Sequence, residues 1–222
     1  MENLIKTPLI DYRTISYNYF EKLYWEKGLM VCGVDEVGRG PLAGPIVAAA
    51  VSLANNANSP LIKDSKTLSE RQLLQAFDWI TTNGSYAIGM ANHNFIDTHS
   101  ITTANHFAMK KAISSLIHAL NNPLSAIIVD AVRLEVNQSF NNAIYAFYKA
   151  ESLSISVAAA SIVAKVYRDR LMNSYNALFS GYAFDTNKGY GTQKHYKALK
   201  EKELSTIHRK SFLKRYIHEI SP

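Results

Sequence analysis

The sequence has 222 residues, with 24 Lys and Arg against 18 Asp and Glu and a formal net charge of +6 at pH 7. This length fits one medium-sized domain with a sizeable core, and the basic balance favours an anionic partner without identifying it. Cys32 is the single cysteine, which excludes an intramolecular disulfide and a cysteine-based zinc site. The longest apolar run, 43–54, is interrupted by Pro45 and Ser52, so we expect no membrane span and a cytoplasmic location.

The first part of the chain predicts a helix followed by two strands. Apolar side chains recur every four residues within 12–27, which indicates an amphipathic helix. We therefore expect an N-terminal helical extension over 1–28 and a main domain over 29–222. Apolar, β-branched-rich runs at 29–35 and 45–53 then predict two strands joined by a glycine-rich turn.

The rest of the chain alternates between strand and helix patterns. Strands are predicted at 85–91 and 125–129, and helices at about 69–83, 94–120, 155–178, 192–203 and 208–219. Early strands, interleaved helices and a helical last third indicate an α/β fold with one central mixed β-sheet flanked by helices. The order of the strands is not determined by these patterns.

Carboxylates follow two of the predicted strands. Asp35 and Glu36 end the first apolar run, and Asp130 follows the run 125–129. If these strands are neighbours, the carboxylates lie close together, and like charges that close require a metal or a shared proton. Hard divalent cations bind such oxygens, so the pattern predicts a metal site. The alternative is that each aspartate caps a turn at the end of its strand.

The turn after the first strand contains closely spaced glycines at positions 38, 40 and 44. Their spacing differs from that of a dinucleotide-binding loop, and Pro41 and Pro45 disfavour a helix start within it. The preceding acid pair would also repel a pyrophosphate in the absence of metal. A rigid turn with open amides beside a metal site therefore suits a sugar–phosphate backbone better.

Five segments, in order, closely resemble the ribonuclease HII (type 2 ribonuclease H) family. They are 33–45 (GVDEVGRGPLAGP), 63–69 (KDSKTLS), 129–130 (VD), 158–169 (AAASIVAKVYRD) and 187–192 (NKGYGT). The resemblance implies an RNase H-like fold for 29–222, with C-terminal helices from about 192. It also implies metal-dependent hydrolysis of the phosphodiester 5′ to a ribonucleotide, in RNA–DNA hybrids or duplex DNA, leaving a 3′-hydroxyl and a 5′-phosphate. The implied role is the removal of misincorporated ribonucleotides.

The resemblance also implies four acidic residues that act in catalysis as metal ligands. Three match directly: Asp35, Glu36 and Asp130. The fourth is an aspartate in the family, but the aligned residue here is Glu151, one methylene longer. Asp169 competes for this role, although its spacing from Lys165 is explained by an ion pair on one helix face. Two Mg²⁺ or Mn²⁺ ions would activate a water and stabilise the leaving oxygen.

A wider set of residues is implied to bind substrate: Gly38, Arg39, Gly40, Ser65, Lys66, Ser161, Lys165, Lys188 and Tyr190. The Gly38-Arg39-Gly40 backbone would sense the 2′-hydroxyl, which distinguishes RNA from DNA at one position. Tyr190 would stack on the sugar of the following nucleotide. The basic residues of the set, together with Arg168, would attract the duplex backbone, although each alone is equally explained as a solvated charge. Asp64 would belong to a phosphate-contacting loop or simply to a turn.

We therefore expect a monomeric endoribonuclease that acts on RNA–DNA hybrids and ribonucleotide-containing duplex DNA. One alternative is ribonuclease HIII-like activity on longer hybrids. That family carries an N-terminal platform domain, for which the 34 residues before Asp35 are too few. The other alternative is a nucleic-acid-binding domain that does not cleave, but clustered acids beside a phosphate path would only weaken binding.

Overall fold

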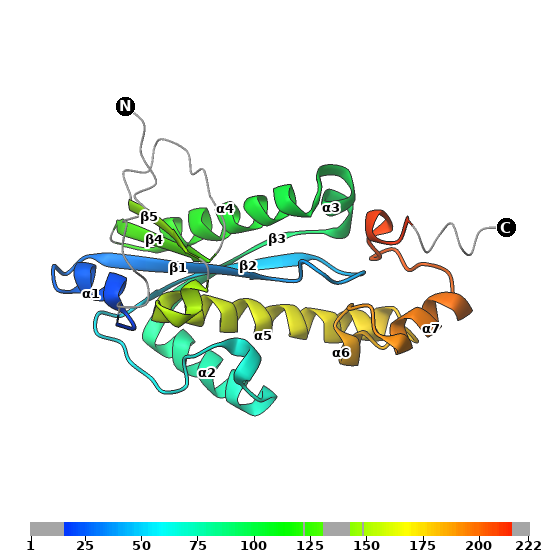
Figure 1. Ribbon diagram of the computed structural model, residues 1–222, viewed down its shortest axis with the longest axis horizontal. Helices are drawn as coiled ribbons and strands as arrows, with labels where there is room; N and C mark the ends of the chain where they lie inside the picture. Colours follow the sequence, from blue (N-terminus) through cyan, green and yellow to red (C-terminus); the bar gives the residue numbers. More distant parts are fainter. Residues whose placement is uncertain (1–15, 122, 131–142, 148, 215–222) are drawn as a thin grey trace.

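The computed structural model describes residues 16–121, 123–130, 143–147 and 149–214. Within these ranges, a five-stranded sheet with the order β3-β2-β1-β4-β5 lies between two helical layers (Figure 1). The strands are β1 Met30–Val37, β2 Ile46–Leu53, β3 Gly84–Ala91, β4 Leu124–Asp130 and β5 Ala143–Phe147. The sheet is mixed, as predicted: β1, β2 and β3 pair antiparallel, whereas β4 and β5 run parallel to β1.

The described helices cover both faces of this sheet. They are α1 Tyr19–Trp25, α2 Glu70–Asn83, α3 His93–His99, α4 Ile101–Ala119, α5 Ile155–Leu178, α6 Phe184–Asn187 and α7 Gln193–Glu201. Short 3₁₀ turns are η2 Ser65–Thr67, η3 Ala150–Ser152 and η4 Lys210–Phe212. Helix α4 packs on one face of the sheet, and α5 and α2 pack on the other (Figure 1). None of the described helices is long and apolar enough to cross a membrane.

Two predicted helices differ from the structure, and one strand was not predicted. The helix predicted over 94–120 is interrupted at Ser100, whose φ of +84° breaks the helix and whose hydroxyl then caps α4 by accepting from the Thr103 N–H at 3.3 Å. Strand β5 was not predicted, because five residues without strict alternation give little signal. The helix predicted over 208–219 is reduced to η4 up to residue 214, and the remainder lies outside the described residues, as does the start of the helix predicted over 12–27.

The C-terminal part returns to the glycine-rich turn. Ala43 forms an isolated antiparallel bridge with His208, and the Arg209 N–H donates to the Leu42 carbonyl at 2.8 Å. His208 and His195 are both buried, with their Nε2 atoms 3.0 Å apart. The turn after β1 is therefore packed against the last elements of the described chain.

Helix α5 approaches β1 so closely that only glycine fits at one position. A Cβ on Gly33 would lie 2.1 Å from the carbonyl carbon of Ser156. This contact fixes the first turns of α5, and the η3 turn that precedes it, against β1, the strand that carries Asp35. Close packing between backbone atoms leaves no room for a side chain to move aside.

We expect Gly33→Ala to lower the free energy of unfolding by at least about 3 kcal/mol, because the added methyl forces the backbones of α5 and β1 apart. Gly40→Ala is the matched control, since its Cβ would meet nothing closer than the Tyr190 Cε1 at 3.7 Å. Urea denaturation of both variants measures the difference. Equal stability of Gly33→Ala and the wild type would contradict this packing.

Candidate active site

The parallel pairing of β1 with β4 brings the predicted carboxylates to one edge of the sheet. Val34 pairs with Val129, and each is followed directly by an aspartate, Asp35 on β1 and Asp130 on β4. The predicted metal site required these two strands to be neighbours, and they are. The residue of β5 that pairs with Asp130 is Phe147. The acids therefore lie on two inner strands, β1 and β4, and β5 is the outer strand beside them.

Asp35 is the most deeply buried of these acids. Only 9% of its surface is exposed. Burial, and then repulsion from Glu36 and Asp130, raises the pKa of Asp35 well above its ordinary value. A hydrogen bond from the Ser161 side chain and another from the Glu36 N–H, at 2.8 Å from Oδ1, partly oppose this rise in pKa. The fold thus holds this carboxylate where its charge is unfavourable unless a cation is present.

Glu36, the next residue on β1, has two hydrogen-bonding partners. Burial raises its pKa, which Arg39 opposes from a distance of 3.4 Å between Nη1 and Oε1. A second hydrogen bond comes from Asn105 on α4, which is 1% exposed and whose Oδ1 has no partner. Sequence reasoning missed Asn105. Its signal was a polar residue within the apolar stripe of a helix, four residues after Ile101 and three before Ala108.

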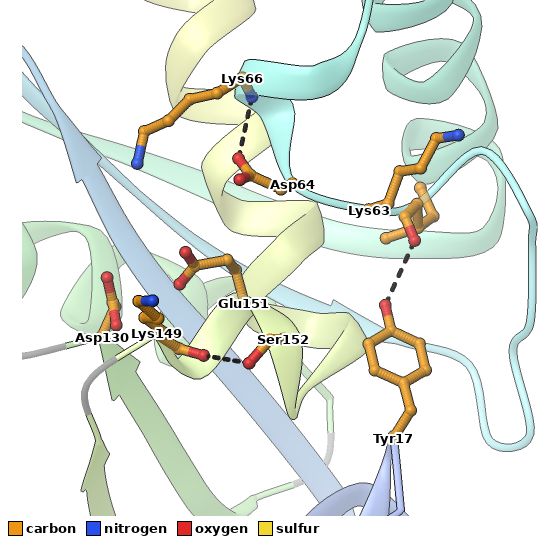
Figure 2. Close-up of a pocket in the computed structure, with 9 residues that line it drawn as sticks. Tyr17, Lys63, Asp64, Lys66, Asp130, Lys149, Glu151 and Ser152 are labelled. Atoms are coloured by element: carbon orange, nitrogen blue, oxygen red, sulfur yellow. Dashed lines mark hydrogen bonds between the residues drawn. The ribbon is translucent and has the colours of Figure 1, made fainter.

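Glu151 lies in a pocket of about 680 Å³ at the same edge. The pocket is lined by Tyr17, Ile62, Lys63, Asp64, Lys66, Asp130, Lys149, Glu151 and Ser152. Figure 2 shows the carboxylates of Glu151 and Asp130 pointing into it, with the Lys149 side chain between them. The η3 turn that carries Glu151 is tied to β4, because the Ala150 N–H donates to Asp130 Oδ1 at 2.9 Å.

The environment of Glu151 resembles that of the other acids. Burial raises its pKa, Asp130 raises it further, and Lys66 lowers it. Among the residues that the structure describes, its buried Oε2 has no hydrogen-bond partner. Asp169, the competing residue, instead forms an ion pair with Lys165 at 2.8 Å, the helix-face pair considered from the sequence. Glu151 is therefore the acid that the fold places beside Asp130.

The donor set fits a hard divalent cation, although the side chains do not already converge on one point. Within the described ranges, no three His, Cys, Asp or Glu side chains are arranged so as to hold an ion. Asp130 and Glu36 are instead engaged with Ala150 and Arg39. Oxygen ligands, mutual repulsion and an unpartnered buried oxygen on Glu151 are nevertheless the chemistry that Mg²⁺ or Mn²⁺ would satisfy.

The expected substrate-binding residues fall into different environments. Ser65 and Ser161 hydrogen-bond each other at 2.9 Å, which links the η2 turn to Asp35 through Ser161. Lys66 faces the Glu151 pocket, and Asp64 caps η2 by accepting from the Lys66 N–H at 2.9 Å, as a turn residue does (Figure 2). Lys165 is engaged by Asp169.

The tyrosine expected to contact the sugar lies against the glycine-rich turn. Tyr190 is 41% exposed, and its Cε1 is the atom nearest to Gly40 on the side where a Cβ would be. The Lys188 ammonium does not face this turn, because it donates to Asn173 and to the Asp185 carbonyl. Arg168 was expected to help attract the duplex backbone, but its side chain is fully buried and donates to backbone carbonyls, so it cannot contact that backbone directly.

Comparison with known proteins identifies the family. Residues 32–215 match the family model described as Ribonuclease HII. A ribonuclease HII of Ruminiclostridium cellulolyticum is 44% identical over 220 residues, which is 98% of this chain and 79% of that protein. The fold is similar to that of ribonuclease H2 from Pyrococcus horikoshii OT3, with a TM-score of 0.69, 23% identity and coverage of 86% of this chain and 99% of the other.

A second solved structure with a similar fold is Bst-RNase HIII in complex with Mn²⁺, with a TM-score of 0.60 and 21% identity, covering 77% of this chain and 69% of the other. The fold is therefore the one shared by these ribonuclease H2 and RNase HIII structures. More narrowly, the chain belongs to the ribonuclease HII family and is a metal-dependent hydrolase of the ribonuclease H type.

We expect Asp35→Asn to raise the free energy of unfolding of the metal-free protein by about 1–2 kcal/mol, because it removes a buried charge. Folded Asp35 keeps its proton to a higher pH than unfolded aspartate does, so its ionisation destabilises the wild type as pH rises above about 3.9. The gain should therefore be small at pH 4 and larger at pH 8.

Urea denaturation in EDTA at both pH values tests this expectation. Asp78→Asn, on an exposed position of α2, is the control and should change stability by less than about 0.5 kcal/mol at either pH. A gain for Asp35→Asn that does not depend on pH would show that the ionised carboxylate is not the source of the instability.

Proposed function

We propose that this protein is an endonuclease that hydrolyses the RNA strand of RNA–DNA hybrids and cleaves 5′ to single ribonucleotides in duplex DNA, leaving a 3′-hydroxyl and a 5′-phosphate. The observation that carries the proposal is the meeting of two features at the end of β1: acids that need a cation, and a glycine-rich turn that faces an exposed tyrosine. A phosphate chain can follow the turn while the scissile group reaches the acids. The cellular role would be the removal of misincorporated ribonucleotides.

The turn has the donors that a 2′-hydroxyl requires. Within the described part of the chain, the N–H groups of Arg39 and Gly40 donate no hydrogen bond. Gly40 has no side chain to cover them, and Tyr190 lies beside it with an exposed ring. These groups can bind a ribose edge and stack on the adjacent sugar, which is how a single ribonucleotide is distinguished from its DNA neighbours.

We infer that Asp35, Glu36, Asp130 and Glu151 hold two divalent ions, Mg²⁺ or Mn²⁺. When bound, such ions supply an activated water and stabilise charge on the scissile phosphate. The acids position the ions, and Ser161 orients Asp35 through its hydrogen bond. Lys66 lies in the pocket of Glu151, where its charge can attract a phosphate of the substrate strand.

Ribonuclease HIII-like preference for longer hybrids is the second candidate. Glu151 is the observation that favours it, because a glutamate stands here where the ribonuclease HII family has an aspartate. The open turn beside Tyr190 favours recognition of a single ribonucleotide instead. The division into an extension over 1–28 and a catalytic domain over 29–222, the monomeric state and the cytoplasmic location stay predictions.

Cleavage of a DNA duplex with one internal ribonucleotide, in Mg²⁺, Mn²⁺ or EDTA, tests the proposed activity. We expect a metal-dependent nick 5′ to the ribonucleotide, and a reduction of at least about 10³-fold in Asp35→Asn, because a metal ligand is lost. A matched all-RNA strand paired with DNA measures the preference for hybrids. Binding without any nick would leave a non-cleaving nucleic-acid-binding domain as the better description.

Metal titration distinguishes the two candidates for the fourth acid. Calorimetric titration with Mn²⁺ should show at least about tenfold weaker binding in Glu151→Gln, because a carboxylate ligand is lost. Asp169→Asn should bind Mn²⁺ like the wild type, because Asp169 is paired with Lys165. The opposite pattern would assign the fourth ligand to Asp169.

A further inference from the structure

Two arginines are fully buried beneath the glycine-rich turn, here called the glycine loop and defined as residues 38–45. Arg168 lies on α5 and Arg209 lies just before η4. Each guanidinium donates three hydrogen bonds, all to backbone carbonyls. Neither forms an ion pair in the described part of the chain. Two buried cations without an anion are unfavourable, so their retention calls for a reason beyond packing.

Arg209 determines the direction of the carbonyls at the start of the loop. It donates to Gly38 O at 2.7 Å, Arg39 O at 3.1 Å and Gly44 O at 2.9 Å. These three carbonyls therefore point inward. A peptide plane whose carbonyl points inward turns its N–H the other way. The N–H groups of Arg39 and Gly40 belong to the planes of the Gly38 and Arg39 carbonyls, and neither donates a hydrogen bond within the described part of the chain.

Arg168 joins this loop to the segment that carries Tyr190. It donates to Pro45 O at 3.0 Å and Ala43 O at 3.3 Å on the loop, and to Lys188 O at 2.9 Å on the other segment. A backbone hydrogen bond of 2.8 Å from the Leu42 N–H to Gly189 O joins the same two segments. One planar guanidinium thus sets the distance between the loop amides and the tyrosine.

The glycine at position 38 is adapted to this arrangement. Its φ is +97°, and a Cβ there would lie 2.4 Å from the Arg168 Nε. The loop backbone and Arg168 therefore lie so close together that no side chain would fit at position 38. Burial, and then the nearby charge of Arg168, lowers the pKa of Arg209 to about 9, which still leaves it charged at neutral pH.

We propose that Arg168 and Arg209 are positioning residues that hold the glycine loop and Tyr190 as one rigid ribonucleotide-reading unit. Their inward carbonyl contacts aim the Arg39 and Gly40 amides outward, and their unpaired charges favour an electron-rich ligand oxygen at those amides. The inference rests on the proposed function, because it deepens how a ribonucleotide is recognised. Two residues that do not contact the substrate would thus determine its specificity.

Paired binding measurements test this proposal. In an Asp35→Asn background, which binds without cleaving, the dissociation constants are measured for two duplexes of one sequence, one all-DNA and one with a single ribonucleotide. Their ratio measures discrimination, and it does not depend on the fraction of protein that is folded. Arg168→Lys and Arg209→Lys keep the charge but cannot span three carbonyls. We expect each to lower the ratio about tenfold or more, because small misplacements of positioned groups have large effects.

Arg170→Lys is the matched control. It lies on the same helix, but its guanidinium stacks over Phe77, with 4.8 Å between Cζ and the ring centroid, and does not contact the loop. Its ratio should equal that of the parent. An unchanged ratio in both loop variants, with only lower thermal stability, would overturn the proposal, as would complete unfolding of both by circular dichroism. A parent ratio of one would instead refute the proposed ribonucleotide recognition itself.

Discussion

The site depends on one unfavourable interaction, the repulsion among carboxylates that the pairing of β1 with β4 forces together. Asp35 and Asp130 follow paired valines in neighbouring parallel strands, so they cannot separate without breaking the centre of the sheet. Burial removes the water that would otherwise screen them, and the pKa of Asp35 rises accordingly. The protein keeps this arrangement although it reduces stability, which is expected where function requires a cation.

The surrounding elements can be understood as supports for that edge. Helix α5 is pressed against Gly33, and this brings Ser161 to Asp35 and the η3 turn to Asp130. Helix α4 contributes Asn105 to Glu36 from the other face of the sheet. Asp35, Glu36 and Asp130 therefore each receive a hydrogen bond from a different element, which orients these three acids. Orientation by surrounding groups is what a site needs if its ligands are to meet an ion at low reorganisation cost.

The glycine loop shows a second use of unpaired charge. Within the described part of the chain, Arg168 and Arg209 donate only to backbone carbonyls, so both positive charges stay beneath the loop. The negative groups lie near the end of β1, and the positive groups lie under the loop that follows it. We propose different tasks for the two sets: the acids would hold ions for the reaction, and the arginines would hold the backbone that reads the sugar.

Much of this could be predicted from the sequence, because the decisive signals are local. Apolar runs that end in Asp35 and Asp130, the glycine spacing after them and five ordered motifs indicated a mixed α/β fold, the family and a metal-dependent nuclease. The sequence could not show that the helix predicted over 94–120 is divided in two at Ser100, because a positive φ in a serine has no periodic signature. It also could not choose between Glu151 and Asp169 as the acid beside Asp130.

The tertiary structure decided which charges face the site and which are buried elsewhere. The sequence by itself indicated Asp35, Glu36 and Asp130, since these acids directly follow apolar runs. From the sequence Arg168 was a possible surface cation and Arg209 was not singled out, because their positions depend on three segments that are distant along the chain, residues 38–45, 188–190 and 209. Charge is a property of a residue, whereas burial and partners are properties of the folded chain. That is why the acids were predictable and the buried arginines were not.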